Sequence, residues 1–134
     1  MSLELVQLLE FPKIIDERGN LSFLEEGAHL PFLIKRTYWI YDVPGGEERG
    51  GHSYFENEEL IIALSGSFDV IVSDGISRRI FSLNRSYYGL YVPAGIWRQM
   101  GNFSTNSLAF IAASTAYNES DYERDLNNFK KKNE

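Results

Sequence analysis

The feature that most restricts the fold of this chain is a series of short apolar and aromatic runs, separated by Gly, Pro, Asn and Asp. Runs of roughly four to eight residues rich in Val, Ile, Phe and Tyr are typical of β-strands, and the separating residues are typical of turns. We predict strands over residues 6–11, 21–25, 34–41, 59–64, 67–73, 77–83, 87–92 and 108–113. Turns are expected at residues 18–20, 44–46, 74–75 and 93–95.

The run over residues 34–41 also alternates in character, so Arg36, Tyr38 and Ile40 are expected to share one face of a strand. Many short strands with no helical pattern between them predict an all-β, antiparallel fold. For a chain of this size we expect a double-sheet jelly roll. Only residues 118–131 have a helical pattern, with Ser120 as the expected N-cap and lysines in the last turn.

The bulk composition narrows the possible partners. A length of 134 residues and a hydrophobic share of 43% suit a single domain over residues 1–134. The sequence has no cysteine, which excludes disulfides and cysteine–metal sites. A formal charge of -6 disfavours nucleic acid as a partner, and no apolar run is long enough to cross a membrane. Since the first residues lack the pattern of a signal peptide, a cytoplasmic location is expected.

A spaced motif begins at Gly46. His52 follows after five residues, Tyr54 stands two positions later, and Glu59 comes after four more residues. Gly66 ends the motif after six further residues. The spacing is that of the first motif of metal-binding cupins, except that Tyr54 occupies the place of the second histidine.

The second cupin motif is also present in altered form. Pro93 and Gly95 are followed at the expected spacing by Arg98, and Asn102 comes after three further residues. Arg98 occupies the place of the motif's histidine. Two matching motifs in a chain of short strands predict a cupin-type double-stranded β-helix, with both motifs facing one cavity.

The substitutions change the chemistry that these positions support. A cupin metal site needs neutral imidazoles and a carboxylate that converge on one cation. Arg98 carries a permanent positive charge and has no lone pair for a metal. His29 is the only other histidine, and it lies in a predicted loop. We therefore predict that the site holds no metal.

The same positions suit a small anionic ligand. Arg18, Arg36 and Arg49 stand singly beside strand patterns, as Arg98 does, and isolated arginines grip phosphate oxygens by forked hydrogen bonds. Trp97 offers a flat surface for a base or a sugar ring. The polar residues of the first motif add proton chemistry, because a histidine exchanges its proton near neutral pH and a tyrosine is a donor or, at lowered pKa, a base.

Nearly the whole chain, from about residue 11 to residue 131, resembles the dTDP-4-keto-6-deoxyglucose 3,4-ketoisomerases, which are sugar-nucleotide cupins also called the WxcM-like family. The resemblance rests on many short matches. They are Lys13, Ile15, Asp16, Arg18, Gly19 and Leu21; Pro31, Phe32, Arg36 and Tyr38; Arg49, Gly50 and His52; Leu64, Gly66, Ser67, Val70, Asp74 and Gly75; Gly89, Tyr91, Val92, Trp97 and Met100; and Tyr117, Glu119, Asp121, Tyr122, Asn128, Phe129 and Lys131.

The resemblance implies a reaction in which the keto group of a dTDP-4-keto-6-deoxyhexose moves from C4 to C3 through an enediol, without a metal or an organic cofactor. The product serves the synthesis of surface glycans such as lipopolysaccharide. The implied catalytic residues are His52, Tyr54 and Tyr38. The implied substrate-binding residues are Arg18, Arg36, Arg49, Glu59, Trp97 and Arg98. Family members are typically dimers, and the first predicted strand is free to pair across such an interface.

Tyr54 departs from the family pattern, in which the second histidine is usually the base. Three explanations follow: Tyr54 or His52 takes over proton transfer, the chain is an altered variant with reduced turnover, or it binds a sugar nucleotide without isomerising it. The alternatives to a ketoisomerase are therefore a non-catalytic sugar-nucleotide-binding cupin and a 3,5-epimerase-like enzyme. Family members also differ at the positions of Arg18 and Arg98, in a way linked to the C4 configuration of the product, which this pair leaves open.

Overall fold

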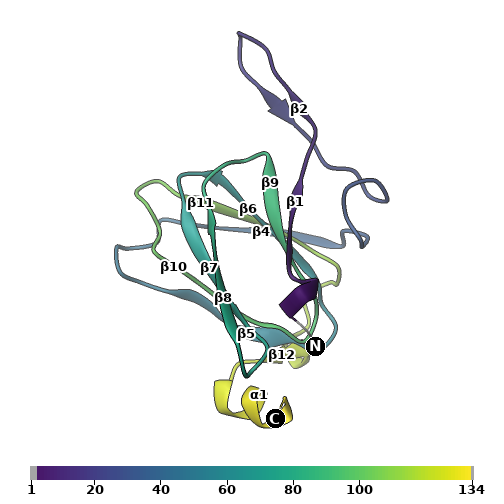
Figure 1. Cartoon of the computed structure of the whole chain (residues 1–134), viewed down its shortest axis with the longest axis vertical. Coiled ribbons are helices and arrows are strands. Elements are labelled where there is room, and N and C mark those ends of the chain that lie inside the picture. The colour runs from purple at the N-terminus through teal and green to yellow at the C-terminus, as the bar shows by residue number, and fades with distance from the viewer. Residues whose placement is uncertain (1–2, 134) are drawn as a thin grey trace.

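The structure, a computed structural model, describes residues 3–133 and consists mainly of two five-stranded antiparallel sheets (Figure 1). In spatial order, the first sheet contains β1 (Gln7–Glu10), β9 (Tyr88–Val92), β6 (Glu59–Ser65), β11 (Leu108–Ala113) and β4 (Arg36–Tyr41). The second contains β12 (Tyr122–Glu123), β5 (Arg49–Tyr54), β10 (Trp97–Gly101), β7 (Phe68–Ser73) and β8 (Arg78–Leu83). The predicted all-β jelly roll with a short C-terminal helix is confirmed.

The main core lies between the two sheets and follows from alternation along the strands. In β7, Phe68, Val70 and Val72 are buried while the residues between them are half-buried. They pack against Ile61 of β6 and Ile111 of β11 from the facing sheet. Interdigitation of two apolar faces is the expected source of stability in such a sandwich.

Two neighbouring strands of the second sheet do not correspond to any of the predicted apolar runs. β5 and β10 pair antiparallel, with His52 opposite Arg98, yet neither was predicted as a strand from apolar runs. Both carry polar side chains toward the interior and Gly residues in their length. Because His52 and Arg98 put polar side chains on the inner faces of these strands, beside the buried Met100 of β10, the strands lack the alternation that identifies a half-buried strand.

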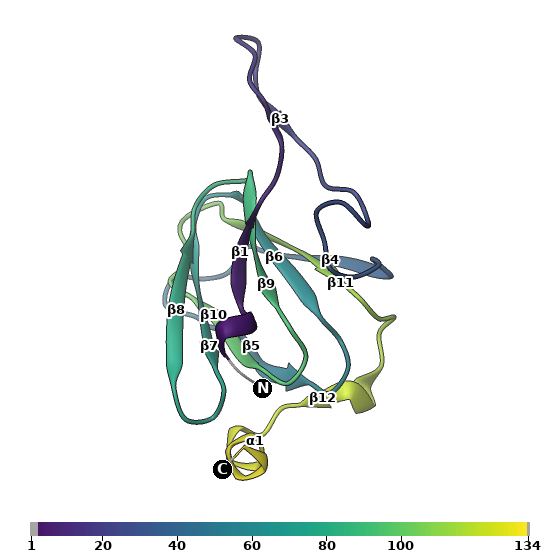
Figure 2. The same ribbon diagram turned by 45° about the vertical axis from the view of Figure 1, so that its right-hand side comes forward.

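A two-stranded arm projects from the barrel (Figures 1 and 2). It is formed by β2 (Lys13–Ile14) and β3 (Leu21–Ser22), with Arg18 in the turn between them. The predicted strand over residues 21–25 is therefore shorter than expected. β3 pairs only with the two residues of β2, so the rest of the predicted strand has no partner. A hairpin isolated in this way is only marginally stable in water.

The C-terminal prediction is wrong at its beginning. Residues Glu119–Asp121 form a 3-10 turn capped by Asn118, β12 follows, and α1 runs only over Leu126–Lys132 with Asp125 as its N-cap. Ser120 is thus not the cap. The reason is tertiary: β12 pairs with β5, and this pairing draws the preceding residues out of a helix. The lysines do lie in the last turn of α1, as expected.

No helix within residues 3–133 combines the length and the apolar character that a membrane span requires.

Candidate functional site

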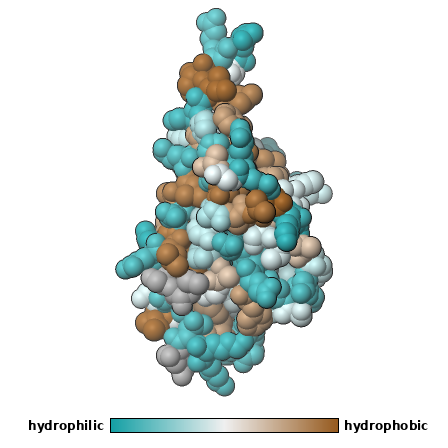
Figure 3. All heavy atoms as spheres, turned by 90° about the vertical axis from the view of Figure 1, so that its right-hand side faces the viewer, coloured by the Kyte–Doolittle hydropathy of each residue, from teal (hydrophilic) through white to brown (hydrophobic). Residues whose placement is uncertain are grey.

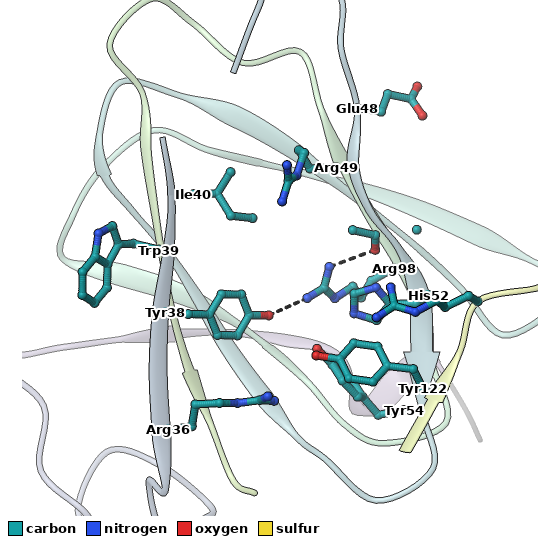
Figure 4. Close-up of a pocket in the computed structure, with 13 residues that line it drawn as sticks. Arg36, Tyr38, Trp39, Ile40, Glu48, Arg49, His52, Tyr54, Arg98 and Tyr122 are labelled. Carbon is teal, nitrogen blue, oxygen red and sulfur yellow. Dashed lines mark hydrogen bonds between the residues drawn. The ribbon is translucent and has the colours of Figure 1, made fainter. Parts of the chain in front are cut away.

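A cavity of about 520 Å³ opens at one end of the barrel, and residues from both sheets and the C-terminal segment line it (Figure 4). β4 supplies its residues on one side, β5 and β10 on the other, and β12 adds a wall at the lower edge. The lining residues are Arg36, Tyr38, Trp39, Ile40, Glu48, Arg49, Gly50, Gly51, His52, Tyr54, Arg98, Tyr122 and Arg124.

A buried ion pair forms the floor of this cavity. Arg98 on β10 and Glu59 on β6 are each 1% exposed, and Nη2 of Arg98 lies 2.7 Å from Oε1 of Glu59. Nε of Arg98 donates to the same oxygen at 2.9 Å. Burial by itself lowers the pKa of Arg98, but the neighbouring negative charge of Glu59 outweighs it, so the pKa is raised. The guanidinium therefore stays charged although it is buried.

Two tyrosine hydroxyls complete the surroundings of the carboxylate. Tyr38 on β4 and Tyr54 on β5 both donate to Oε2 of Glu59, the latter at 3.1 Å. Nη2 of Arg98 in turn donates to the hydroxyl of Tyr38 at 2.8 Å, as Figure 4 shows. Burial is the largest influence on the pKa of Tyr38, which is raised well above its usual range. Tyr38 is thus a neutral phenol whose oxygen already accepts a cationic donor.

The position of the Arg98 guanidinium requires a glycine at residue 50. Nη1 of Arg98 donates to the carbonyl of Gly50 at 2.9 Å, and a Cβ atom on Gly50 would lie 2.1 Å from that same nitrogen. Gly50 has φ of +72°, a left-handed conformation that favours glycine. Gly50 and Gly51 together oppose the single residue Gln99, so the strand bulges here.

His52 is the one imidazole in the cavity, and it is held neutral. It is 6% exposed, and its Nε2 atom has no hydrogen-bond partner within residues 3–133. Burial, followed by the charges of Arg98, Arg124 and Arg36, lowers the pKa of His52 to about 2. A neutral imidazole keeps one nitrogen lone pair that can accept a proton, and His52 lines the cavity in which a ligand would lie.

Cationic side chains surround the opening. Arg36 and Arg49 point into the cavity from opposite sides in Figure 4. Nε of Arg36 is buried and unpartnered in the described part of the chain, and its guanidinium lies 5.7 Å from the ring centre of Tyr117. Arg124, which rests over the ring of Tyr122 at 4.3 Å, adds a third cation. The three arginines can bind the oxygens of a phosphorylated ligand.

Most of the predicted site residues meet here, but two do not. Trp97 precedes Arg98 on β10 and therefore points to the opposite face of the sheet, where it packs against Phe129 of α1. Arg18 lies on the arm, pairs with Asp16 at 2.9 Å and is absent from the cavity lining. Neither contacts a ligand in the cavity of its own barrel.

Sequence reasoning assigned no role to Tyr122 and Arg124, which line the cavity from the C-terminal segment. They reach it because Asp121 accepts hydrogen bonds from the backbone of Glu56 and Asn57, which fixes the segment beside β5. In the sequence, Asp121 falls within the helical pattern over residues 118–131, which gives no sign of these contacts.

Within residues 3–133, no three or more His, Cys, Asp or Glu side chains are grouped so that they could hold a metal ion. Of the four positions of the two motifs, only His52 and Glu59 keep a metal-binding residue type. The buried guanidinium of Arg98 is itself paired with Glu59, so the donor set does not suit a cation.

The arrangement therefore combines a neutral imidazole, a phenol that accepts a hydrogen bond from a guanidinium, and a cationic opening. Its chemistry is proton transfer on a small anionic ligand, with hydrogen-bond donors ready for a developing oxyanion. Figure 4 shows Tyr38, His52 and Arg98 directed toward one another across the cavity.

Comparisons with known proteins agree with this chemistry. The profile of the FdtA family, described as WxcM-like, C-terminal, matches residues 4–134. A TDP-4-oxo-6-deoxy-alpha-D-glucose-3,4-oxoisomerase of Aneurinibacillus thermoaerophilus is 41% identical over 125 residues, which are 93% of this chain and 90% of that protein. A 3,4-ketoisomerase from Helicobacter canadensis has 37% identity and a TM-score of 0.92, covering 95% of this chain and 96% of that one. QdtA, a sugar 3,4-ketoisomerase from Thermoanaerobacterium thermosaccharolyticum solved with TDP, has 32% identity and a TM-score of 0.95, covering 98% and 96%.

Proposed function

The chain belongs to the FdtA family of WxcM-like C-terminal domains, and from that membership and the geometry of its cavity we infer that it is a 3,4-ketoisomerase of TDP-linked keto sugars. It moves the keto group of a TDP-4-keto-6-deoxyhexose from C4 to C3. The observation that carries this conclusion is His52, a neutral and nearly buried imidazole that lines a cavity with a cationic opening and whose buried Nε2 atom has no hydrogen-bond partner within residues 3–133.

The proposed reaction is a proton abstraction next to a carbonyl. His52 removes the proton from C3, the electrons of that C–H bond form the C3–C4 double bond, and the C4 oxygen becomes a hydroxyl. The resulting enediol loses the proton of its C3 hydroxyl, and C4 takes up a proton to give the 3-keto sugar. No electrons leave the substrate, so the reaction needs no external oxidant.

Tyr38 suits the transfer of the hydroxyl proton. Its oxygen accepts from Nη2 of Arg98 and donates to Glu59, so it can give a proton to the C4 oxygen and take one from the neighbouring C3 oxygen. Arg98 is committed to Glu59, Gly50 and Tyr38. We therefore propose that it supports the phenol and that the diphosphate lies against Arg36 and Arg49.

We further propose a homodimer of single-domain chains that acts in the cytoplasm. β1 lies at the edge of its sheet, with β9 on one side only. The arm exposes Ile14, Ile15 and Leu21, which are 53%, 71% and 55% exposed, and Figure 3 shows apolar side chains on the arm and on the barrel below it. A second copy that covers this surface would place Arg18 near the cavity of its partner, which accounts for an arginine so far from its own cavity.

The decisive test uses heavy water. The protein is incubated with TDP-4-keto-6-deoxyglucose, and the products are followed by nuclear magnetic resonance. A ketoisomerase gives a 3-keto product, whose C4 carries deuterium from the solvent or the proton that His52 took from C3. Deuterium at C5 indicates a 3,5-epimerase, and measurable TDP binding with neither a 3-keto product nor exchange indicates a non-catalytic binding protein. Either of these results would refute the proposed function.

A further inference from the structure

Tyr54 occupies the place of the second histidine of the first motif, and its contacts indicate what it does there. We propose that Tyr54 is a positioning residue: its ring holds the imidazole of His52, and its hydroxyl supplies one of the donors to Glu59. His52 alone then moves the proton between the carbon atoms. This inference rests on the proposed ketoisomerase function and assigns the division of labour within that site.

The hydroxyl of Tyr54 is committed to a buried carboxylate. Tyr54 is 5% exposed and donates to Oε2 of Glu59 at 3.1 Å. Burial, and next the charge of Glu59, raise the pKa of Tyr54 far above its usual range. A phenolate here would face the carboxylate directly, and within residues 3–133 the hydrogen bond that Arg98 donates to the hydroxyl of Tyr38 has no counterpart at Tyr54. Taking a proton from carbon requires that phenolate beforehand, and giving one to carbon creates it, so both steps are unfavourable for Tyr54.

The ring of Tyr54 belongs to a cluster of three rings. The centroid of His52 lies 4.8 Å from that of Tyr54, with planes 79° apart, and 4.9 Å from that of Tyr122, with planes 61° apart. The two tyrosine rings are 4.7 Å apart. Such edge-to-face contacts have a preferred geometry and stabilise it. Because Nε2 of His52 has no hydrogen-bond partner in the described chain, ring packing orients the imidazole and leaves that nitrogen free.

A histidine at position 54 would serve neither purpose. Its ring ends well short of the tyrosine hydroxyl when both start from the same Cβ atom, so it could not reach Oε2 of Glu59. That buried oxygen would lose a donor, which is costly inside a protein. A second imidazole would also lie against His52 and compete with it for protons. Tyr54 and Arg98 both donate to the carboxylate of Glu59, so the loss of either leaves that buried group with fewer donors.

The pKa of His52 provides a readout that would not change if Tyr54 had a purely structural role. Charged or titratable groups face it from every surrounding element: Arg36 and Tyr38 on β4, Tyr54 on its own strand, Arg98 on β10, and Tyr122 and Arg124 in the C-terminal segment. Loss of the ring of Tyr54 would admit water to the imidazole. Since burial is the largest influence that lowers the pKa of His52, its pKa would then rise toward the ordinary value.

The test compares Tyr54→Phe, Tyr54→His and Tyr54→Ala, with turnover of TDP-4-keto-6-deoxyglucose measured from about pH 5 to about pH 8. Tyr54→Phe keeps the ring, so its kcat should stay within about three-fold of the wild type, whereas removal of a proton-transfer group costs about 100-fold or more. Tyr54→His and Tyr54→Ala should each lose about ten-fold or more in kcat with a smaller change in KM. Tyr54→Ala should also gain an acid limb in its pH profile.

Tyr91→Phe is the matched control. Tyr91 is also buried and also donates to a glutamate, Glu58, but it does not line the cavity. Loss of the Tyr91 hydroxyl should lower thermal stability about as much as Tyr54→Phe does and leave kcat unchanged. Circular dichroism and TDP binding on every variant identify any loss of fold.

A Tyr54→Phe enzyme as slow as Tyr54→Ala, or a Tyr54→His enzyme faster than the wild type, would overturn the positioning role and make Tyr54 a proton-transfer residue. If Tyr54→Ala does not fold, the order of the Phe and His variants still decides between the two roles. A wild-type protein without any turnover would count against the ketoisomerase function itself, which keeps the two failures distinct.

Discussion

Two arginine–carboxylate pairs in this molecule have the same chemistry and opposite surroundings. In the barrel, Arg98 and Glu59 are each 1% exposed, whereas on the arm Arg18 is 87% and Asp16 35% exposed. Both pairs have a contact below 3 Å. The buried pair has lost its water, so removing one partner leaves an uncompensated charge in the interior. The exposed pair competes with water and contributes little to stability. Burial thus makes one pair part of the cavity floor and leaves the other free to change partners.

The largest effect is expected when the buried pair is broken. Arg98→Ala should lower the free energy of unfolding by about 3–5 kcal/mol, because Glu59 is left buried without its cation. Denaturation by urea measures the loss. The double variant Arg98→Met with Glu59→Gln is the control, since it removes both charges. It should be more stable than Arg98→Ala, and an equal or greater loss in the double variant would contradict the role of the uncompensated charge.

A smaller effect is expected when the guanidinium is only displaced. Gly50→Ala places a Cβ atom against Nη1 of Arg98 and should cost about 1–3 kcal/mol more than a substitution without a clash. Gly46→Ala is the matched control, because Gly46 also has a positive φ, of +84°, but nothing lies within 4 Å of the added atom. Urea denaturation of both variants separates the clash from the backbone strain. Equal losses would show that Arg98 moves aside without cost.

The charges around the buried pair should also make stability depend on pH. His52 has an ordinary pKa of 6.5 in the unfolded chain and a pKa of about 2 in the folded protein. Below pH 6.5 the unfolded chain therefore binds a proton that the folded chain rejects, and stability falls as the pH drops, by about 1.4 kcal/mol per pH unit.

Urea denaturation at several values between about pH 7 and about pH 5 checks this slope, with His52→Asn as the control. That variant lacks the titrating imidazole and should show a clearly shallower dependence. An identical slope in the two proteins would mean that His52 is protonated in the fold.

The smallest effect on stability is expected on the arm. Arg18→Ala should leave the melting temperature unchanged, because the Arg18–Asp16 pair is exposed. Its KM for the TDP-sugar should nevertheless rise several-fold if Arg18 reaches the cavity of a second copy.

Mixing Arg18→Ala with His52→Asn tests whether that contact crosses a dimer. His52→Asn alone should lose about 1,000-fold in kcat, as expected for a general base. A mixed dimer contains one cavity with both residues intact, so activity should return on mixing. Mixtures no more active than the sum of the separate variants would show that Arg18 does not act between chains.

Much of the barrel was predictable because it depends on local pattern. The alternation of Phe68, Val70 and Val72 and the turn at Asp74 predict β7, β8 and the hairpin between them, and the structure confirms all three. The apolar runs did not identify β5 and β10, since His52 and Arg98 place polar side chains on the interior faces of these strands. Parity along β10 was nonetheless readable: once Arg98 points into the cavity, its neighbour Trp97 must point out.

The two motifs predicted one part of the cavity, and the resemblance to the ketoisomerases added Arg36, Tyr38 and Arg49, which also line it. Motif spacing led to His52, Tyr54, Glu59 and Arg98, and the structure brings all four together. Tyr122 and Arg124 were missed because the pairing of β12 with β5 spans nearly seventy positions, as in Tyr122 with Tyr54, and leaves no local pattern. The helical pattern over residues 118–131 concealed it.

The amino-acid sequence by itself determined the strand alternation, the turns and the spacing of the motifs, because each depends on residues that are neighbours along the chain. The tertiary structure alone decided that Arg98 would neutralise Glu59 and that Tyr54 would pack against His52 and Tyr122. It also decided that Arg18 would stand apart on the arm. Such contacts depend on which distant strands meet and on how much water they exclude, and it is burial that turns an ordinary ion pair into the floor of a cavity.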